Sequence, residues 1–245
     1  MQLDISLFTV FVYASITAIA TGVGALPLYV MRKPSARLIA LSGAVAAGLM
    51  GGASWGLMVE GFDLSVSKTI LGALIGIVTI RLSHDWIESK DVKWGSISGA
   101  DAKRIIMVVG VMFAHSFTEG VGVGVAFGGG ERLAVWVTSA IALHNIPEGL
   151  AIALTMVPRG TSVARAGLWG IFSSLPQPLM AVPAFIFVLF FSPFLPVGLG
   201  FAAGAMGWMI FSEMLPEARE EASAVGVYSM ATVAALLMFG FQALL

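Results

Sequence analysis

The amino-acid sequence predicts an all-α integral membrane protein with eight membrane-spanning helices. Hydrophobic residues make up 58% of the 245 residues and charged residues only 11%, whereas an ordinary soluble domain has about 25% charged residues. The mean hydropathy is +0.94. Eight apolar segments are each close to the roughly 20 residues that a helix needs to cross a bilayer. They span residues 7–30, 37–59, 67–87, 104–127, 132–156, 166–191, 195–215 and 223–244.

These segments form one polytopic membrane domain over residues 1–245. The first segment follows residues 1–6, which lack the charged start of a signal peptide, and it is too long for the apolar part of one. We therefore expect a first helix that stays in the membrane. Only residues 88–103 form a connection longer than a short loop, so we expect no soluble domain. The sequence has no basic tract, which predicts no nucleic-acid partner.

The fourth and fifth segments each carry a histidine and a glutamate four residues apart. The first pair is His115 and Glu119, and the second is His144 and Glu148. Residues i and i+4 lie on one face of a helix, so each pair points the same way. The connection at 128–131 is too short to do more than turn the chain back. Four metal-capable side chains should therefore face one another near the middle of the membrane.

A structural role is the alternative for these buried charges. A carboxylate at the bilayer centre costs at least about 2.5 kcal/mol, so it needs a partner, a water-filled cavity or a function. One histidine or glutamate could serve a hydrogen bond between helices, but two pairs at one depth favour a metal site. The chain has no cysteine, and imidazole with carboxylate suits zinc, iron or manganese. Without thiolate ligands, a bound ion can leave again.

Other segments contribute weaker candidates. Gln177, between two prolines of the sixth segment, could offer a neutral oxygen to a metal; a buried amide that satisfies irregular backbone is the alternative. Met50 could be a soft ligand, although packing is the simpler account. Glu213 could be an entrance or exit ligand, or part of a solvated helix end. His84 lies at a predicted boundary and needs no special role.

The lysines and arginines predict the orientation of the chain. Connections rich in positive charge tend to stay on the cytoplasmic side, and 11 of the 13 fall in the first, third, fifth and seventh connections. Both termini should therefore be non-cytoplasmic. In this topology residues 46–51 and the similar residues 202–207 run in opposite directions, as in an inverted-repeat transporter. Close packing of small residues is the alternative explanation.

The motifs HSFTEG (115–120) and HNIPEG (144–149) resemble those of the ZIP family of divalent metal transporters. Residues 174–179 and 202–218 resemble the sixth and seventh helices of that family. The resemblance covers nearly the whole chain. It implies a 3+2+3 helix arrangement with inverted repeats, a binuclear metal site on the fourth and fifth helices, and metal movement toward the cytoplasm. The residues that it assigns to the site are His115, Ser116, Glu119, His144, Asn145, Glu148 and, on the entrance side, Met50.

Gln177 is the main departure from the family pattern, because a glutamate of the second metal position commonly stands there. An amide brings no charge, and two divalent ions carry four positive charges into a poorly solvated site. We therefore expect one tightly held metal and a second that is weak or absent. Ser116, Thr118 and Ser212 also depart from the common family residues.

The sequence thus predicts a transporter, not an enzyme, that moves a divalent cation into the cytosol. Zinc is the first candidate, followed by iron and manganese. We expect no cofactor beyond the transported ion, and the expected partner is the lipid bilayer. The alternatives are an intramembrane metal-dependent hydrolase, which would use the same ligands to activate water, and a non-transporting metal sensor. The sequence leaves open a plasma membrane or an organelle membrane, a plastid one included, and a monomer or a homodimer.

Overall fold

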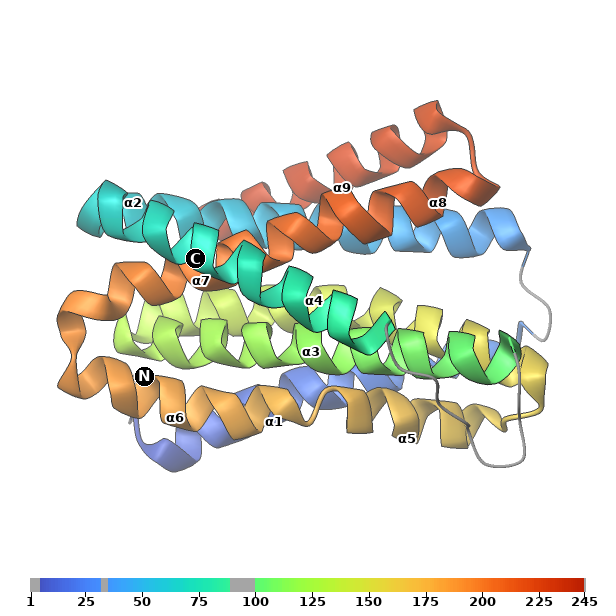
Figure 1. Ribbon diagram of the computed structural model, residues 1–245, viewed down its shortest axis with the longest axis horizontal. Helices are drawn as coiled ribbons and strands as arrows, with labels where there is room; N and C mark the ends of the chain where they lie inside the picture. The colour runs from blue at the N-terminus through green and yellow to red at the C-terminus, as the bar shows by residue number, and fades with distance from the viewer. Residues whose placement is uncertain (1–4, 32–34, 89–99, 245) are drawn as a thin grey trace.

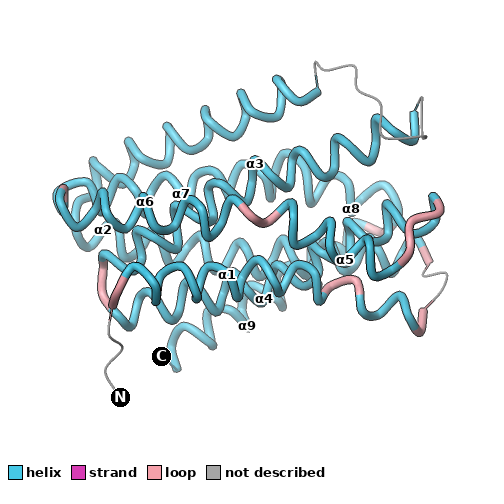
Figure 2. The backbone as a smooth tube through the Cα atoms, turned by 90° about the horizontal axis from the view of Figure 1, so that it is seen from below, coloured by secondary structure: helices cyan, strands magenta, loops and turns pink. Residues whose placement is uncertain are grey.

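The computed structural model describes residues 5–31, 35–88 and 100–244, and every regular element in these ranges is helical. The helices run along the length of an elongated bundle, as Figure 1 shows from one side and Figure 2 from below. The main helices are α1 (Leu7–Val23), α2 (Ala36–Glu88), α3 (Ala100–Gly128), α4 (Glu131–Met156), α5 (Val163–Ser173), α6 (Pro176–Phe190), α7 (Leu195–Met209), α8 (Leu215–Glu221) and α9 (Ala224–Leu244).

The described residues contain six helical segments long and apolar enough to cross a membrane. Large apolar side chains also remain exposed on the outside of the bundle, for example Phe211 on the helix after α7 and Leu237 on α9. A soluble protein rarely exposes so much contiguous apolar surface. The all-helical membrane class predicted from composition is therefore confirmed. The segments are Leu7–Tyr29, Ala36–Trp86, Glu131–Arg159, Val163–Phe190, Ser192–Glu221 and Ala224–Ala243.

Helix α2 contains both the second and the third predicted segment. Its 53 residues are interrupted at Ser65, whose backbone is extended (φ −171°, ψ 107°). The chain folds back there, so that the two arms of α2 run in opposite directions (Figure 1). Gly61 permits the reversal, because a Cβ at this position would lie 2.6 Å from the Thr69 side chain. The sequence predicted a connection between two helices over residues 60–66, but only Ser65 in this range departs from helical geometry.

Two other predicted segments are each broken into shorter helices. Segment 166–191 is α5 and α6, separated near the middle of the bundle by Ser174 and Leu175 (Figure 2). Pro176 explains the break, since proline has no N–H to donate to the preceding helical turn and its ring clashes with the carbonyl four residues earlier. Segment 195–215 begins as α7 and continues through one π-helical turn, η4 (Ile210–Met214), into α8. Such turns are frequent at functional sites.

Helices α3 and α4 are joined by a tight turn and run antiparallel (Figure 1). Gly130 has φ +110°, a backbone conformation that glycine adopts without a steric penalty. The predicted reversal between the two motif-bearing segments is thus confirmed. It places the motif of α3 beside the motif of α4.

Candidate metal centre

The two predicted pairs of side chains meet in the interior of the bundle. His115 and Glu119 come from α3, and His144 and Glu148 come from α4. Their side chains are at most 5% exposed. One ligand atom from each residue lies within 4.8 Å of the others. The cluster predicted from the two i, i+4 spacings is therefore present.

The contacts within the cluster converge on one carboxylate oxygen. Glu119 Oε1 lies 2.5 Å from His144 Nε2 and 3.4 Å from His115 Nε2. His115 Nε2 is also 3.4 Å from Glu148 Oε1. Among the residues that the structure describes, neither ring nitrogen of His115 makes a hydrogen bond, and Glu148 Oε1 has no hydrogen-bond partner. Buried polar groups are normally satisfied, and a cation among these atoms would satisfy the unpaired nitrogen and oxygen.

Gln177 closes the cluster on the side of α6. Its Nε2 donates a 2.6 Å hydrogen bond to Glu119 Oε2. Its Oε1 accepts hydrogen bonds from the Thr17 hydroxyl, 2.5 Å away, and from Asn145 Nδ2, 3.2 Å away. Asn145 Nδ2 also donates to the main-chain carbonyl of Thr17 at 2.9 Å. Gln177 is thus next to the cluster, as predicted, and hydrogen bonds occupy both ends of its amide.

Helix α1 supplies one residue next to the site that sequence reasoning missed, Thr17, and a second buried threonine, Thr21, one turn away from it. Thr17 and Thr21 lie four residues apart on one face, and Thr21 shares a 2.8 Å hydrogen bond with the Ser174 hydroxyl. Both threonines are buried. Two threonines at i, i+4 in a mostly apolar helix were the available signal. Such hydroxyls commonly bond within their own helix, however, so the spacing alone does not name their partners.

The glycines that follow the two glutamates let other helices approach the centre. A Cβ at Gly120 would lie 2.6 Å from the carbonyl oxygen of Gln177, and one at Gly149 would overlap the carbonyl oxygen of Thr21. Backbone atoms cannot move aside as a flexible side chain can. Other helices therefore approach the centre closely at these two positions.

Three other predicted site residues are buried, and within the described part of the chain they form no hydrogen bond or ion pair with the four cluster side chains. Ser116 follows His115 on α3 and is 3% exposed. Met50 belongs to the main hydrophobic core, with Leu57 and Met206 among its members. Asn145 Oδ1 is buried and has no hydrogen-bond partner. A metal-binding role for Ser116, Met50 and Asn145 stays a prediction.

A second pair of an imidazole and a carboxylate lies outside the cluster. His84 Nε2 on α2 is 3.5 Å from Glu213 Oε1 in the π-helical turn η4, and its Nδ1 is 3.9 Å from Asp85. Glu213 Oε1 is buried without a hydrogen-bond partner. Sequence reasoning assigned no role to His84 and treated Glu213 alone. No local spacing could have joined them, because they meet only when α2 packs against the end of α7.

The donor set of the cluster determines what it can bind. Two imidazoles and two carboxylates suit a divalent first-row metal, and the two carboxylates balance its charge. The short distance between His144 and Glu119 shows that these groups already converge. A cation bound by His144 Nε2 and Glu119 Oε1 could replace the hydrogen bond between these two side chains.

Curated relatives give an independent comparison, although no family model matches the chain. The chain is 43% identical to a candidate zinc transporter of Arabidopsis thaliana, in an alignment of 96% of this chain and 38% of the relative. It is 30% identical to the zinc transporter GufA of Myxococcus xanthus, over 81% of this chain and 84% of the relative. It is 32% identical to the zinc transporter ZIPB of Bordetella bronchiseptica, over 91% and 74%. The chain thus spans well under half the length of the plant relative and most of the two bacterial ones.

Proposed function

Because this chain belongs to the ZIP family of zinc transporters, we propose that it carries a divalent metal cation across a membrane through the centre between α3 and α4. Zinc is the first candidate, followed by iron and manganese. The observation that carries this proposal is the buried cluster of His115, Glu119, His144 and Glu148. No cofactor beyond the transported ion is required.

The chemistry of the cluster suits a cargo that must be released. Two carboxylates offset the charge of one divalent ion, and two neutral imidazoles complete a four-ligand set. The ligands contain no thiolate, which would hold zinc more tightly. Membership of a transporter family assigns the chain a non-enzymatic role, which disfavours the hydrolase alternative.

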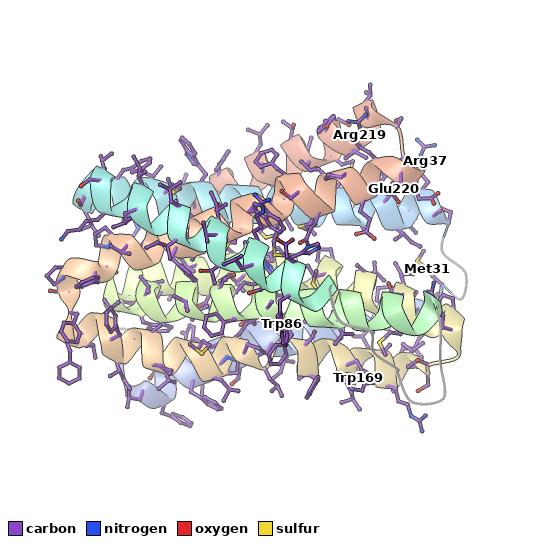
Figure 3. All side chains as sticks on the ribbon, viewed as in Figure 1. Met31, Arg37, Trp86, Trp169, Arg219 and Glu220 are labelled. Carbon is purple, nitrogen blue, oxygen red and sulfur yellow. The ribbon has the colours of Figure 1, made fainter. Side chains whose placement is uncertain are left out.

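We further propose eight crossings in a 3+2+3 arrangement, within a single domain of residues 1–245. Counting the two arms of α2 separately, and α5 with α6 and α7 with α8 as one crossing each, supports this number. The first arm of α2 and helix α7 run in opposite directions (Figure 1), as inverted repeats would. Arg37 and Arg219, from the first and seventh predicted connections, lie at the same end of the bundle (Figure 3). That end would be cytoplasmic, with both termini on the opposite side.

Flux into liposomes that contain only this protein tests the transport proposal. Zinc entry measured with an internal fluorescent chelator should exceed that in empty liposomes, and iron or manganese should compete with it. A purified chain that binds zinc without any flux would be a metal sensor. Hydrolysis of membrane peptides without flux would support the enzyme alternative.

The orientation is tested with two matched serine substitutions in a chain that has no cysteine. Ser35→Cys lies before α2 and Ser192→Cys lies between α6 and α7, and both serines are exposed. In intact sealed cells we expect an impermeant thiol reagent to label the cysteine at 192 and to spare that at 35, which should react only after permeabilisation. The reverse pattern would overturn the topology and the proposed direction of transport.

We also propose that Glu213, which pairs with His84 outside the cluster, is an exit ligand for the ion on its way toward the cytoplasm. We expect Glu213→Gln to lower the maximal zinc flux about threefold to tenfold, because an ion leaving the centre loses one charged partner. The zinc concentration for half-maximal flux should change little, since Glu213 is outside the cluster. Glu220→Gln, at an exposed carboxylate seven residues further on, is the control and should match the parent. Equal zinc flux in Glu213→Gln and Glu220→Gln would show that Glu213 takes no part in transport.

A further inference from the structure

We propose that Gln177 is a positioning residue whose amide N–H takes the place of a second cation beside Glu119, and that Thr17 and Asn145 hold it in that orientation. The metal centre would then carry one zinc ion. This inference rests on the proposed function and adds to it the residue that limits the number of bound ions.

The orientation of the amide follows from a chain of hydrogen bonds that starts on α1. The main-chain carbonyl of Thr17 can only accept, so the Asn145 atom 2.9 Å from it is the nitrogen. The same nitrogen lies 3.2 Å from Gln177, and the atom that it meets there must be the oxygen. The nitrogen of Gln177 is therefore the atom 2.6 Å from Glu119 Oε2. A carboxylate only accepts, so every step is consistent.

The oxygen of Gln177 has no lone pair left for a metal. An amide oxygen has two acceptor sites, and Asn145 and the Thr17 hydroxyl use both. The Thr17 oxygen lies 2.5 Å from Gln177 Oε1 and 2.7 Å from the carbonyl of Ala14. The Thr17 hydroxyl has a single proton for these two acceptors, and the shorter distance assigns it to Gln177 Oε1. Direct coordination by Gln177 would break this contact.

Glu119 is consequently divided between two tasks. Its Oε2 receives the amide N–H, while its Oε1 faces His144 and His115. A second divalent ion at Oε2 would have to share this oxygen with a hydrogen-bond donor that carries partial positive charge. The cluster would also hold four positive charges against two carboxylates, at a buried site where such an imbalance is costly. One ion, bound at Oε1 and completed by Glu148, satisfies the centre.

The number of ions is measured on the purified full chain with zinc alone as the probe. Calorimetry should show one ion at the centre of the parent, and X-ray absorption should show no zinc–zinc scattering. Gln177→Glu should admit a second ion, with zinc–zinc scattering at about 3.5–4 Å, the spacing of two-metal sites. This scattering separates two adjacent ions from an ion bound at His84 and Glu213.

The positioning role is tested by removing the Thr17 hydroxyl. Thr17→Val should weaken zinc binding about threefold to tenfold, the range expected for one buried hydrogen bond. Thr17→Ser, which restores the hydroxyl, should return the parent affinity. Thr21→Val is the matched control, because it removes a buried hydroxyl one turn away that contacts Ser174 and not Gln177. It should bind zinc as the parent does.

Failure of this inference differs from failure of the proposed function. Zinc–zinc scattering in a parent that transports zinc would overturn the single-ion centre and leave transport standing. So would a Gln177→Glu protein that still holds one ion. Equal affinities of Thr17→Val and Thr17→Ser would remove Thr17 from the argument. A parent that neither binds nor transports zinc would overturn the proposed function and this inference together.

Discussion

Glu119→Gln and Glu148→Gln are each expected to abolish most zinc uptake while the protein still reaches the membrane. Each change removes one of the two charges that balance the cation, in a cluster whose four side chains are at most 5% exposed. Breaking a buried ion pair by removing one partner costs about 3–5 kcal/mol, which corresponds to at least about 100-fold in zinc affinity. Uptake of radioactive zinc, normalised to the amount of protein in the membrane, measures the effect.

The matched control is Glu60→Gln, on an exposed face near the end of the first arm of α2. It makes the same chemical change outside the cluster, so its uptake should equal that of the parent. Parent-level uptake in both cluster variants would mean that the four side chains are structural. The transport proposal would then lose the observation on which it rests.

Gly149→Ala is expected to destabilise the protein strongly and to reduce transport with it. An added Cβ would overlap the carbonyl oxygen of Thr21 and lie 2.6 Å from its carbonyl carbon. Because these are backbone atoms, α1 must move away, and the contact between Thr17 and Gln177 moves with it. Overpacking typically costs about 1–3 kcal/mol, so the Tm in detergent should fall by roughly 2–12 °C for a chain of this size.

Gly207→Ala, in α7, provides the comparison. A Cβ there would meet nothing within 4 Å, and alanine is the better helix former by about 0.5–1 kcal/mol. We expect its Tm to equal or exceed that of the parent. A fall of similar size in both variants would show that helix packing around Gly149 is not specific.

Some features of the fold could be predicted because they depend only on the spacing of residues that are close in the sequence. The i, i+4 pairs and the short connection at 128–131 place four metal-capable side chains together whatever the rest of the chain does. Apolar segment length likewise gave the membrane class. Segment boundaries were less accurate: a single extended residue, Ser65, separates the arms of α2, and a proline-induced break divides α5 from α6. Mean hydropathy is averaged over a whole segment, so it does not detect a break of one or two residues.

By itself, the sequence determined the class of the protein, the four-residue cluster and its suitability for a divalent metal. The tertiary structure alone decided what surrounds that cluster: the Thr17 hydroxyl on Gln177, from 160 residues away, the orientation of the Gln177 amide, and the pairing of His84 with Glu213. The physical reason is that these contacts form between helices that lie far apart in the sequence. A helical period fixes which residues share a face, but the meeting of two faces depends on packing between helices, here through Gly120 and Gly149, where main chains approach too closely for any side chain.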